Sequence, residues 1–159
     1  YVGSVECVRL LLEARAGVNQ HTDLGCTPLF VACDQGIAEC VQLLLDAHAA
    51  VNQPQSDQRT PLIAACDHGH ADCVQLLIDA HAAVEQSQSD GLTPLHAAVE
   101  DADLRLAPVR PQSRAECVKM LLTANAIVNH PRQDGRTPLI ASCRHSSAEC
   151  VQLLLAAHA

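Results

Sequence analysis

The tripeptide Thr-Pro-Leu occurs four times, and the spacing of its copies constrains the fold more than any other feature. The copies begin at Thr27, Thr60, Thr93 and Thr137, at intervals of 33, 33 and 44 residues. The dipeptide Cys-Val follows the same intervals and begins at Cys7, Cys40, Cys73, Cys117 and Cys150. Both series place one insertion of 11 residues between Thr93 and Cys117. A fixed period of this length indicates similar units stacked in a row.

Each unit has the pattern of two short helices followed by a loop. Thr27 can cap a helix whose first residue is Pro28, where the missing N–H of proline costs nothing. Val41, Leu44 and Leu45 then have the i, i+3, i+4 spacing of a buried helix face. The sequence predicts first helices near 28–35, 61–68, 94–102 and 138–145. It predicts second helices near 4–13, 37–46, 70–79, 114–123 and 147–156.

The ends of these helices carry their own predictions. Ser113 with Glu116 has the spacing of a capping box, which would start the second helix of the third unit. After each second helix the chain must turn sharply, and glycine in the left-handed conformation usually provides that turn. His48, His81 and Asn125 stand at this position, so we predict a positive φ at all three.

The sequence Thr93-Pro94-Leu95-His96-Ala97-Ala98 resembles the motif of the ankyrin repeat family. The resemblance covers nearly the whole chain except the insertion, and it implies an all-α, helix-turn-helix solenoid with short β-hairpin finger loops. Phe30, Ile63 and Ile140 replace the motif histidine in the other units. A Thr–His hydrogen bond of the family is therefore expected only between Thr93 and His96.

The repeat phase predicts a single ankyrin array over 1–159. It has a partial repeat at 1–23, full repeats at 24–56, 57–89 and 90–133, and a partial repeat at 134–159. The third full repeat carries the insertion, near 102–112, which we interpret as a loop after a prolonged first helix, with a second contact element as the alternative. Neither end has the polar face of a capping repeat, so we expect further repeats at both ends of a longer chain.

Composition narrows the function classes. The net charge of −8 and pI of about 5.5 disfavour nucleic-acid binding, and no apolar run reaches the length of a membrane span. The number of cysteines, nine, is odd, and most of them recur within helical patterns. These features favour reduced thiols in an intracellular protein, cytoplasmic or nuclear.

The stretch from Cys66 to Cys73, which includes His68 and His70, is the one that most resembles a metal site or a catalytic site. Structural zinc needs four convergent ligands, whereas these two cysteines occupy ordinary repeat positions. A disulfide between Cys33 and Cys40 within one helical hairpin is an alternative to packed thiols, and we favour the thiols. We therefore predict no metal, no cofactor, no disulfide and no catalysis. The Cys-Val cysteines, from Cys7 to Cys150, should be buried.

The resemblance implies that partner-binding residues lie in the fingers and at the ends of the first helices. The finger positions are Asp23, Cys26, Asp57, Arg59, Asp90, Leu92, Asp134 and Arg136. The helix positions are Asp34, Gln35, Asp67, His68, Glu100, Asp101, Arg144 and His145. Most of their charges are acidic, which suits a basic protein partner as well as it suits an ordinary solvated face. The chain is thus expected to be a protein-binding scaffold. A structural spacer, or a regulatory segment of a larger protein, is the alternative.

Overall fold

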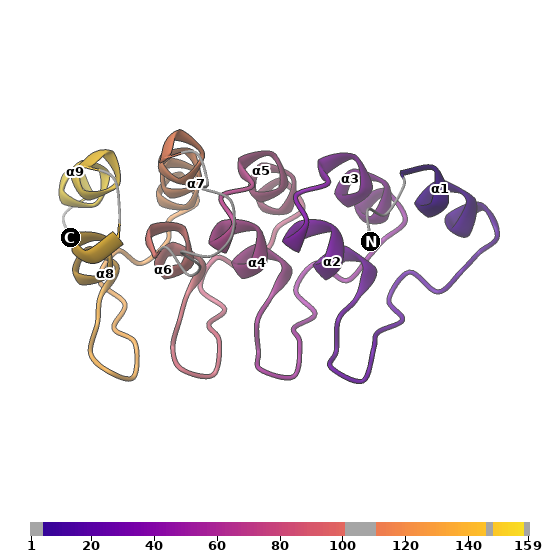
Figure 1. Ribbon diagram of the computed structural model, residues 1–159, viewed down its shortest axis with the longest axis horizontal. Coiled ribbons are helices and arrows are strands. Elements are labelled where there is room, and N and C mark those ends of the chain that lie inside the picture. The colour runs from indigo at the N-terminus through magenta and orange to yellow at the C-terminus, as the bar shows by residue number, and fades with distance from the viewer. Residues whose placement is uncertain (1–4, 101–110, 146–147, 158–159) are drawn as a thin grey trace.

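Helices in two parallel rows form the body of the chain, and loops project from one row as fingers (Figure 1). The computed structural model describes residues 5–100, 111–145 and 148–157. The first helices are α2 (Pro28–Asp34), α4 (Pro61–Asp67), α6 (Pro94–Val99) and α8 (Pro138–His145). The second helices are α1 (Val5–Glu13), α3 (Ala38–Asp46), α5 (Ala71–Asp79), α7 (Pro111–Thr123) and α9 (Ala148–Ala156). Helices of each row pack against their neighbours along the row, and the two helices of a unit pack across the rows. This arrangement confirms the all-α solenoid.

The predicted caps explain where the first helices begin. The hydroxyl oxygen of Thr27 accepts a hydrogen bond from the backbone N–H of Phe30 at 3.1 Å. Thr60 makes the same bond with Ile63 at 3.2 Å. A proline follows each threonine at the first helical position, where its fixed φ suits the helix. Thr93 and His96 close a reciprocal capping box, which confirms the predicted Thr–His bond.

Three boundary predictions in the third unit are wrong. Helix α6 ends at Val99 rather than near residue 102, because Glu100 has an extended backbone with ψ of 139°. The expected extension of this helix beyond Glu100 lies at residues 101–107, outside the described residues. Helix α7 begins at Pro111 rather than near residue 114. Ser113 therefore lies inside the helix and does not cap it.

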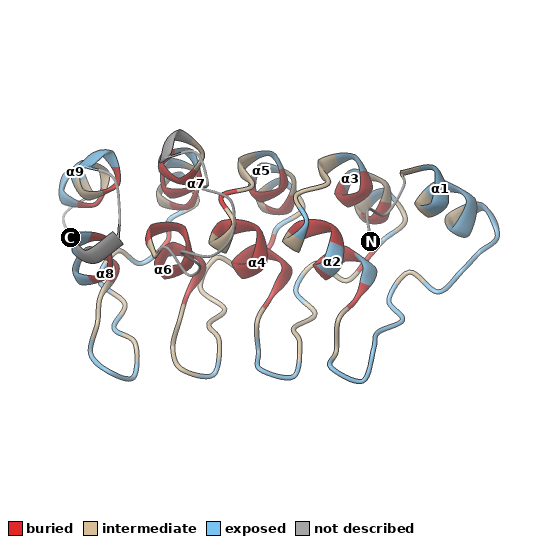
Figure 2. Cartoon of the chain, viewed as in Figure 1, coloured by how far each residue is buried: buried red, intermediate tan, exposed pale blue. Residues whose placement is uncertain are grey.

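The core lies between the two rows of helices, and α4 and α6 are its most buried elements (Figure 2). Every residue of α4 except its last is buried. The predicted burial of Cys40, Cys73, Cys117 and Cys150 is confirmed. Cys7 is exposed, so that prediction is wrong. Helix α1 has no buried residue, because no first helix among the described residues covers its inner face.

Left-handed residues shape the loops. His48, His81 and Asn125 have φ of 61°, 61° and 63°, which confirms the prediction for the helix ends. The fingers bend at a second left-handed position, occupied by Gly25, Gln58, Gly91 and Gly135. Each finger closes on itself by a backbone hydrogen bond, such as that from the N–H of Gln55 to the carbonyl of Arg59 at 2.9 Å. The fingers are thus hairpin turns, without assigned strands among the described residues.

Gln58→Gly is expected to raise the free energy of unfolding by about 0.5 kcal/mol. Gln58 has φ of 69° at a position where the other fingers carry glycine. A β-carbon makes this conformation cost roughly 1 kcal/mol, and the larger freedom of glycine in the unfolded chain offsets part of the gain. Urea denaturation measures the change. Gln55→Gly, in the same finger but outside the left-handed region, should destabilise the protein, and equal effects of the two variants would refute the explanation.

Candidate functional site

The side chain of Arg59 joins two neighbouring units at the angle between the fingers and the first helices. Its guanidinium lies 2.5 Å from the carboxylate of Asp67 and 3.6 Å from that of Asp34. Asp34 ends α2, Asp67 ends α4 and Arg59 comes from the finger between them. The same guanidinium lies 5.8 Å from the centre of the Phe30 ring, which is within the range of a cation–π contact.

A second group of charges lies in the next two fingers and just beyond the end of α6. Nη1 of Arg132 donates to both carboxylate oxygens of Glu100, at 2.8 and 2.9 Å, and Nη2 pairs with Asp90 of the preceding finger. Arg136 pairs with Asp134 at 2.6 Å within its own finger. Arg132 is mostly buried, with 12% of its side chain exposed. A paired, partly buried arginine holds its neighbours in one geometry, so these bonds fix the positions of the last two fingers.

We name these residues the finger–helix surface. It comprises Asp34, Arg59, Asp67, His68, Asp90, Glu100, Arg132, Asp134 and Arg136. Its five carboxylates outnumber its three arginines, and each carboxylate is engaged by arginine or histidine of the same chain. The surface therefore presents a fixed pattern of mixed charge with an acidic excess.

Protonation of this surface depends on its internal bonds. Nε2 of His68 lies 3.3 Å from the carboxylate of Asp34. Their hydrogen bond lowers the pKa of Asp34 and raises the pKa of His68. Burial acts in the opposite direction on Asp67, whose pKa is raised even though Arg59 lies beside it. The pair of Asp34 and His68 is consequently strongest at mildly acidic pH.

His68→Gln is expected to destabilise the protein at pH 6 by less than about 1 kcal/mol, since partly exposed pairs are screened by water. Glutamine is the natural residue at this position in the preceding unit, Gln35. The folded pKa of His68 is raised, so its stabilisation is complete below about pH 6.5 and is lost as the pH rises through the folded value. Urea unfolding at pH 6 and pH 8 measures the difference, and a difference that grows with pH would contradict the pairing.

His70 and Arg114 make the same contact in successive units although they differ in type. Nε2 of His70 lies 3.3 Å from the carbonyl oxygen of Asp34. Arg114, at the equivalent position before a Cys-Val pair, donates to the carbonyl of Asp67 at 2.9 Å. Arg114 also donates to the carbonyls of Ala97, in the last turn of α6, and of Glu100, just beyond its end. These contacts tie the second helix of one unit to the first helices of two units.

The structure brings together some of the predicted binding residues and leaves others apart. Arg59, Asp34, Asp67 and His68 form the first cluster, and Asp90, Glu100, Asp134 and Arg136 belong to the second. Gln35 donates to Asp34 at 3.2 Å, whereas Asp23 and Asp57 lie on exposed finger turns and Leu92 is half-buried. Cys26 lies near the start of the array, where it lines a separate groove. Asp101 lies outside the described residues, and Arg144 and His145 are placed only by the backbone of α8.

Sequence reasoning missed Arg132 and the contacts of Arg114. At the position of Arg132 the other units carry Thr22, Gln55 and Gln88, and a search for departures from the repeat would have singled it out. Arg114 likewise departs from the repeat, because the two preceding units carry Ile37 and His70 at its position.

The buried thiols have environments unsuited to nucleophilic chemistry. All nine cysteines lie in the described part of the chain and are free. Burial raises the pKa of Cys73 to about 11 and that of Cys117 to about 12, and it raises the pKa of Cys33 and Cys66 further. A thiol in such surroundings stays protonated and unreactive. Within residues 5–100, 111–145 and 148–157, no cluster of three or more histidine, cysteine or acidic side chains could hold a metal ion.

Comparisons with known proteins agree with this architecture. A sequence model described as ankyrin repeats (3 copies) matches residues 1–55, 47–109 and 85–159. No curated protein matches the chain. No helix in the described ranges is both long enough and apolar enough to cross a membrane. Ankyrin repeats generally mediate interactions between proteins, and the family is typically non-enzymatic. From its repeat period, its paired helices and this match along its whole length, the chain belongs to the ankyrin repeat family.

Proposed function

We propose that this chain is a non-catalytic scaffold that holds a protein partner against its finger–helix surface and finger turns. The observation that carries the proposal is the network of ion pairs around Arg59 and Arg132, which fixes side chains that differ from unit to unit. A preorganised surface loses little side-chain entropy on binding, so it favours a specific partner. A spacer would need no such pattern of non-equivalent residues.

The partner that fits the finger turns best is a protein segment with an excess of positive charge. Asp23 and Asp57 are exposed on neighbouring finger turns, and the described structure contains no ion pair to the side chain of either residue. Their charges are therefore available to lysine or arginine of a partner, with an attraction that weakens as salt is added. The free thiols support a reducing compartment, the cytoplasm or the nucleus, as the site of this interaction.

Affinity purification with isosteric variants tests the proposal. Asp23→Asn combined with Asp57→Asn removes two charges from the finger turns and preserves the side-chain acceptor that Arg59 uses at 3.0 Å. Asp46→Asn combined with Asp79→Asn makes the same change at the exposed ends of α3 and α5. We expect quantitative mass spectrometry to show basic proteins captured by the wild type and the helix-end variant, and depleted about tenfold with the finger variant. Equal capture by both variants would place the binding elsewhere.

A further inference from the structure

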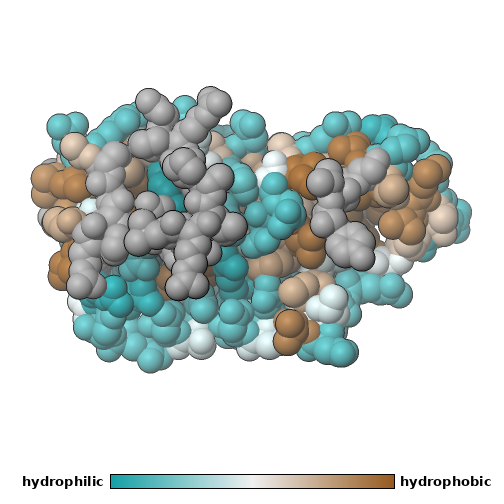
Figure 3. Space-filling view, viewed as in Figure 1, coloured by the Kyte–Doolittle hydropathy of each residue, from teal (hydrophilic) through white to brown (hydrophobic). Residues whose placement is uncertain are grey.

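Leu24, at the tip of the first finger, is the most exposed large hydrophobic residue in the described part of the chain. Its exposed fraction is 67%, whereas the others reach at most 57%. Asp57, Asp90 and Asp134 occupy the same position in the later fingers. Figure 3 shows hydrophobic colour at the first finger, among fingers that are otherwise mostly hydrophilic. A leucine thus replaces a charged side chain at a place that water reaches.

The exposure of this position does not depend on how many fingers surround it. Asp57 is exposed although its finger is bonded to a neighbour on both sides. On one side the N–H of Ser56 donates to the carbonyl of Leu24 at 3.0 Å, and on the other the carbonyl of Asp57 accepts from the N–H of Ser89 at 3.3 Å. The tip of a finger therefore faces solvent in the interior of the array as well as at its edge.

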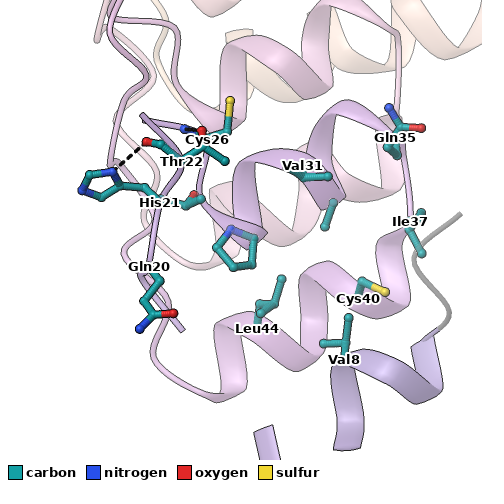
Figure 4. A pocket seen from close by; sticks show the side chains of 13 residues that line it. Val8, Gln20, His21, Thr22, Cys26, Val31, Gln35, Ile37, Cys40 and Leu44 are labelled. Atoms are coloured by element: carbon teal, nitrogen blue, oxygen red, sulfur yellow. Dashed lines mark hydrogen bonds between the residues drawn. The ribbon is translucent and has the colours of Figure 1, made fainter. Parts of the chain in front are cut away.

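The first finger forms its turn without the side chain of Leu24. In the later fingers the aspartate at this position accepts a hydrogen bond from the N–H two residues on, as Asp57 does from Arg59 at 3.0 Å. In the first finger the hydroxyl of Thr22 accepts from the N–H of Cys26 at 3.2 Å instead, and Figure 4 shows these two residues side by side. The turn therefore leaves the leucine side chain free for another role.

The backbone of Leu24 is held firmly against the second finger. Its carbonyl oxygen accepts from both the N–H and the hydroxyl of Ser56, at 3.0 and 2.8 Å. Gly25 follows with φ of 80°, and a β-carbon there would lie 3.1 Å from Cα of Gln55. Glycine permits this close approach of the two fingers. An apolar side chain on a fixed backbone loses little entropy when a partner covers it.

Two carboxylates flank the exposed leucine. Asp23 precedes Leu24 in the same finger, and Asp57 follows Ser56, the residue that bonds to Leu24. Both aspartates are exposed, and the described residues include no ion pair to either side chain. Cys26 stands where the second and last fingers carry arginine, so no guanidinium of the first finger neutralises this region. The result is an apolar spot bordered by negative charge.

We propose that Leu24 is an apolar anchor for the protein partner, whose contact segment carries an apolar side chain between basic ones. This inference rests on the proposed function, in which the finger turns bind a basic segment. The basic side chains pair with Asp23 and Asp57, and the apolar side chain covers Leu24 and removes it from water. A segment that is only basic leaves the leucine exposed and gains less.

Selection from a displayed library of random peptides on the complete immobilised chain tests this chemistry. The critical variant is Leu24→Asp, which introduces the residue of the three later fingers and is therefore expected to fold. Because it adds a negative charge, attraction by charge alone predicts tighter binding of basic peptides, whereas an apolar anchor predicts weaker binding. Leu10→Asp is the control, since it makes the same change at a leucine of α1 that is 56% exposed.

We expect peptides selected on the wild type to combine apolar and basic residues, and to bind Leu24→Asp about tenfold more weakly. Leu10→Asp should bind them as the wild type does. Equal or tighter binding to Leu24→Asp would overturn the anchor. The double variant Asp23→Asn with Asp57→Asn tests the proposed function separately, because full retention of the peptides by this variant would contradict attraction of a basic segment. Failure to select any peptide would contradict both.

Discussion

Arg114→Met is expected to lower the free energy of unfolding by about 3 kcal/mol, although the residue lies outside the predicted binding surface. Arg114 is buried, and its guanidinium donates to the carbonyls of Asp67, Ala97 and Glu100. Methionine retains most of the apolar stem but supplies no donor. Hydrogen bonds from a charged group contribute roughly 1.5 to 3 kcal/mol each, and the bonds of one side chain are not additive. The loss should therefore exceed that of any single surface ion pair.

Lys119→Met provides the matched control, because it removes a positive charge from the same helix. Nζ of Lys119 lies 2.8 Å from the carboxylate of Glu149, and both side chains are about half exposed. An exposed pair of this kind contributes less than about 1 kcal/mol. Urea denaturation of both variants measures the comparison. Similar losses in the two would mean that Arg114 stabilises the protein only by its charge.

Arg114→Lys separates the geometry of the guanidinium from its charge. The ammonium group of lysine is a compact donor, whereas the planar guanidinium reaches carbonyls of two first helices. We expect the lysine variant to recover less than half of the stability lost in the methionine variant. Full recovery would show that one of the contacts is sufficient.

Most of this fold could be predicted because the two repeated motifs, Thr-Pro-Leu and Cys-Val, lie at positions that the helices require. Thr27 and Thr60 cap helices and Pro28 begins one, so the phase of the Thr-Pro-Leu series is also the phase of the helices. Positive φ at His48 and His81 was predictable for a related reason, since the chain can leave a second helix in this direction only through a left-handed residue.

The predictions that failed concern places where residues or their neighbours differ from unit to unit. The end of α6 at Val99 could not be located, because helix propensity favours continuation through Glu100 and nothing local reveals the capping by Arg114. Nor does the sequence show that the acidic side chains of the finger–helix surface are paired within the chain. Arg132 lies far from Glu100 in sequence, and only the packing of the fingers shows that the two charges are paired. Cys7 is exposed because no first helix among the described residues covers α1, which the place of Cys7 in the partial repeat at 1–23 already indicated.

His96→Ala is expected to lower the free energy of unfolding by about 3 kcal/mol through two separable effects. His96 is completely buried, so truncation leaves a cavity. It also bonds at both ring nitrogens: Nδ1 lies 2.8 Å from the hydroxyl oxygen of Thr93, and Nε2 lies 3.2 Å from the carbonyl oxygen of Arg136. With the proton on Nε2, the ring donates to Arg136 and accepts from Thr93. The second bond joins one unit to the finger of the next.

His96→Ile separates the bonds from the volume, since isoleucine occupies this position in the second and fourth units, at Ile63 and Ile140. We expect this variant to lose roughly 1 to 2 kcal/mol at pH 7, less than the alanine variant. Ile63→Ala, a large-to-small change at the same position without polar bonds, should cost roughly 2 to 4 kcal/mol and supplies the cavity effect alone. Equal stability of the isoleucine variant and the wild type would show that the two bonds contribute nothing.

The pH dependence of these variants provides the more specific signature. Burial lowers the pKa of His96, so below about pH 6.5 the unfolded chain binds a proton that the folded ring resists. Stability contributed by His96 is therefore complete at pH 7 and declines as the pH falls towards 5. His70 has a shift of the same sign and His68 one of the opposite sign, but both remain in the variant. The difference between wild type and His96→Ile consequently isolates His96. We expect that difference to shrink on acidification, and a difference that stays constant between pH 7 and pH 5 would show that the folded ring accepts a proton as readily as the unfolded one.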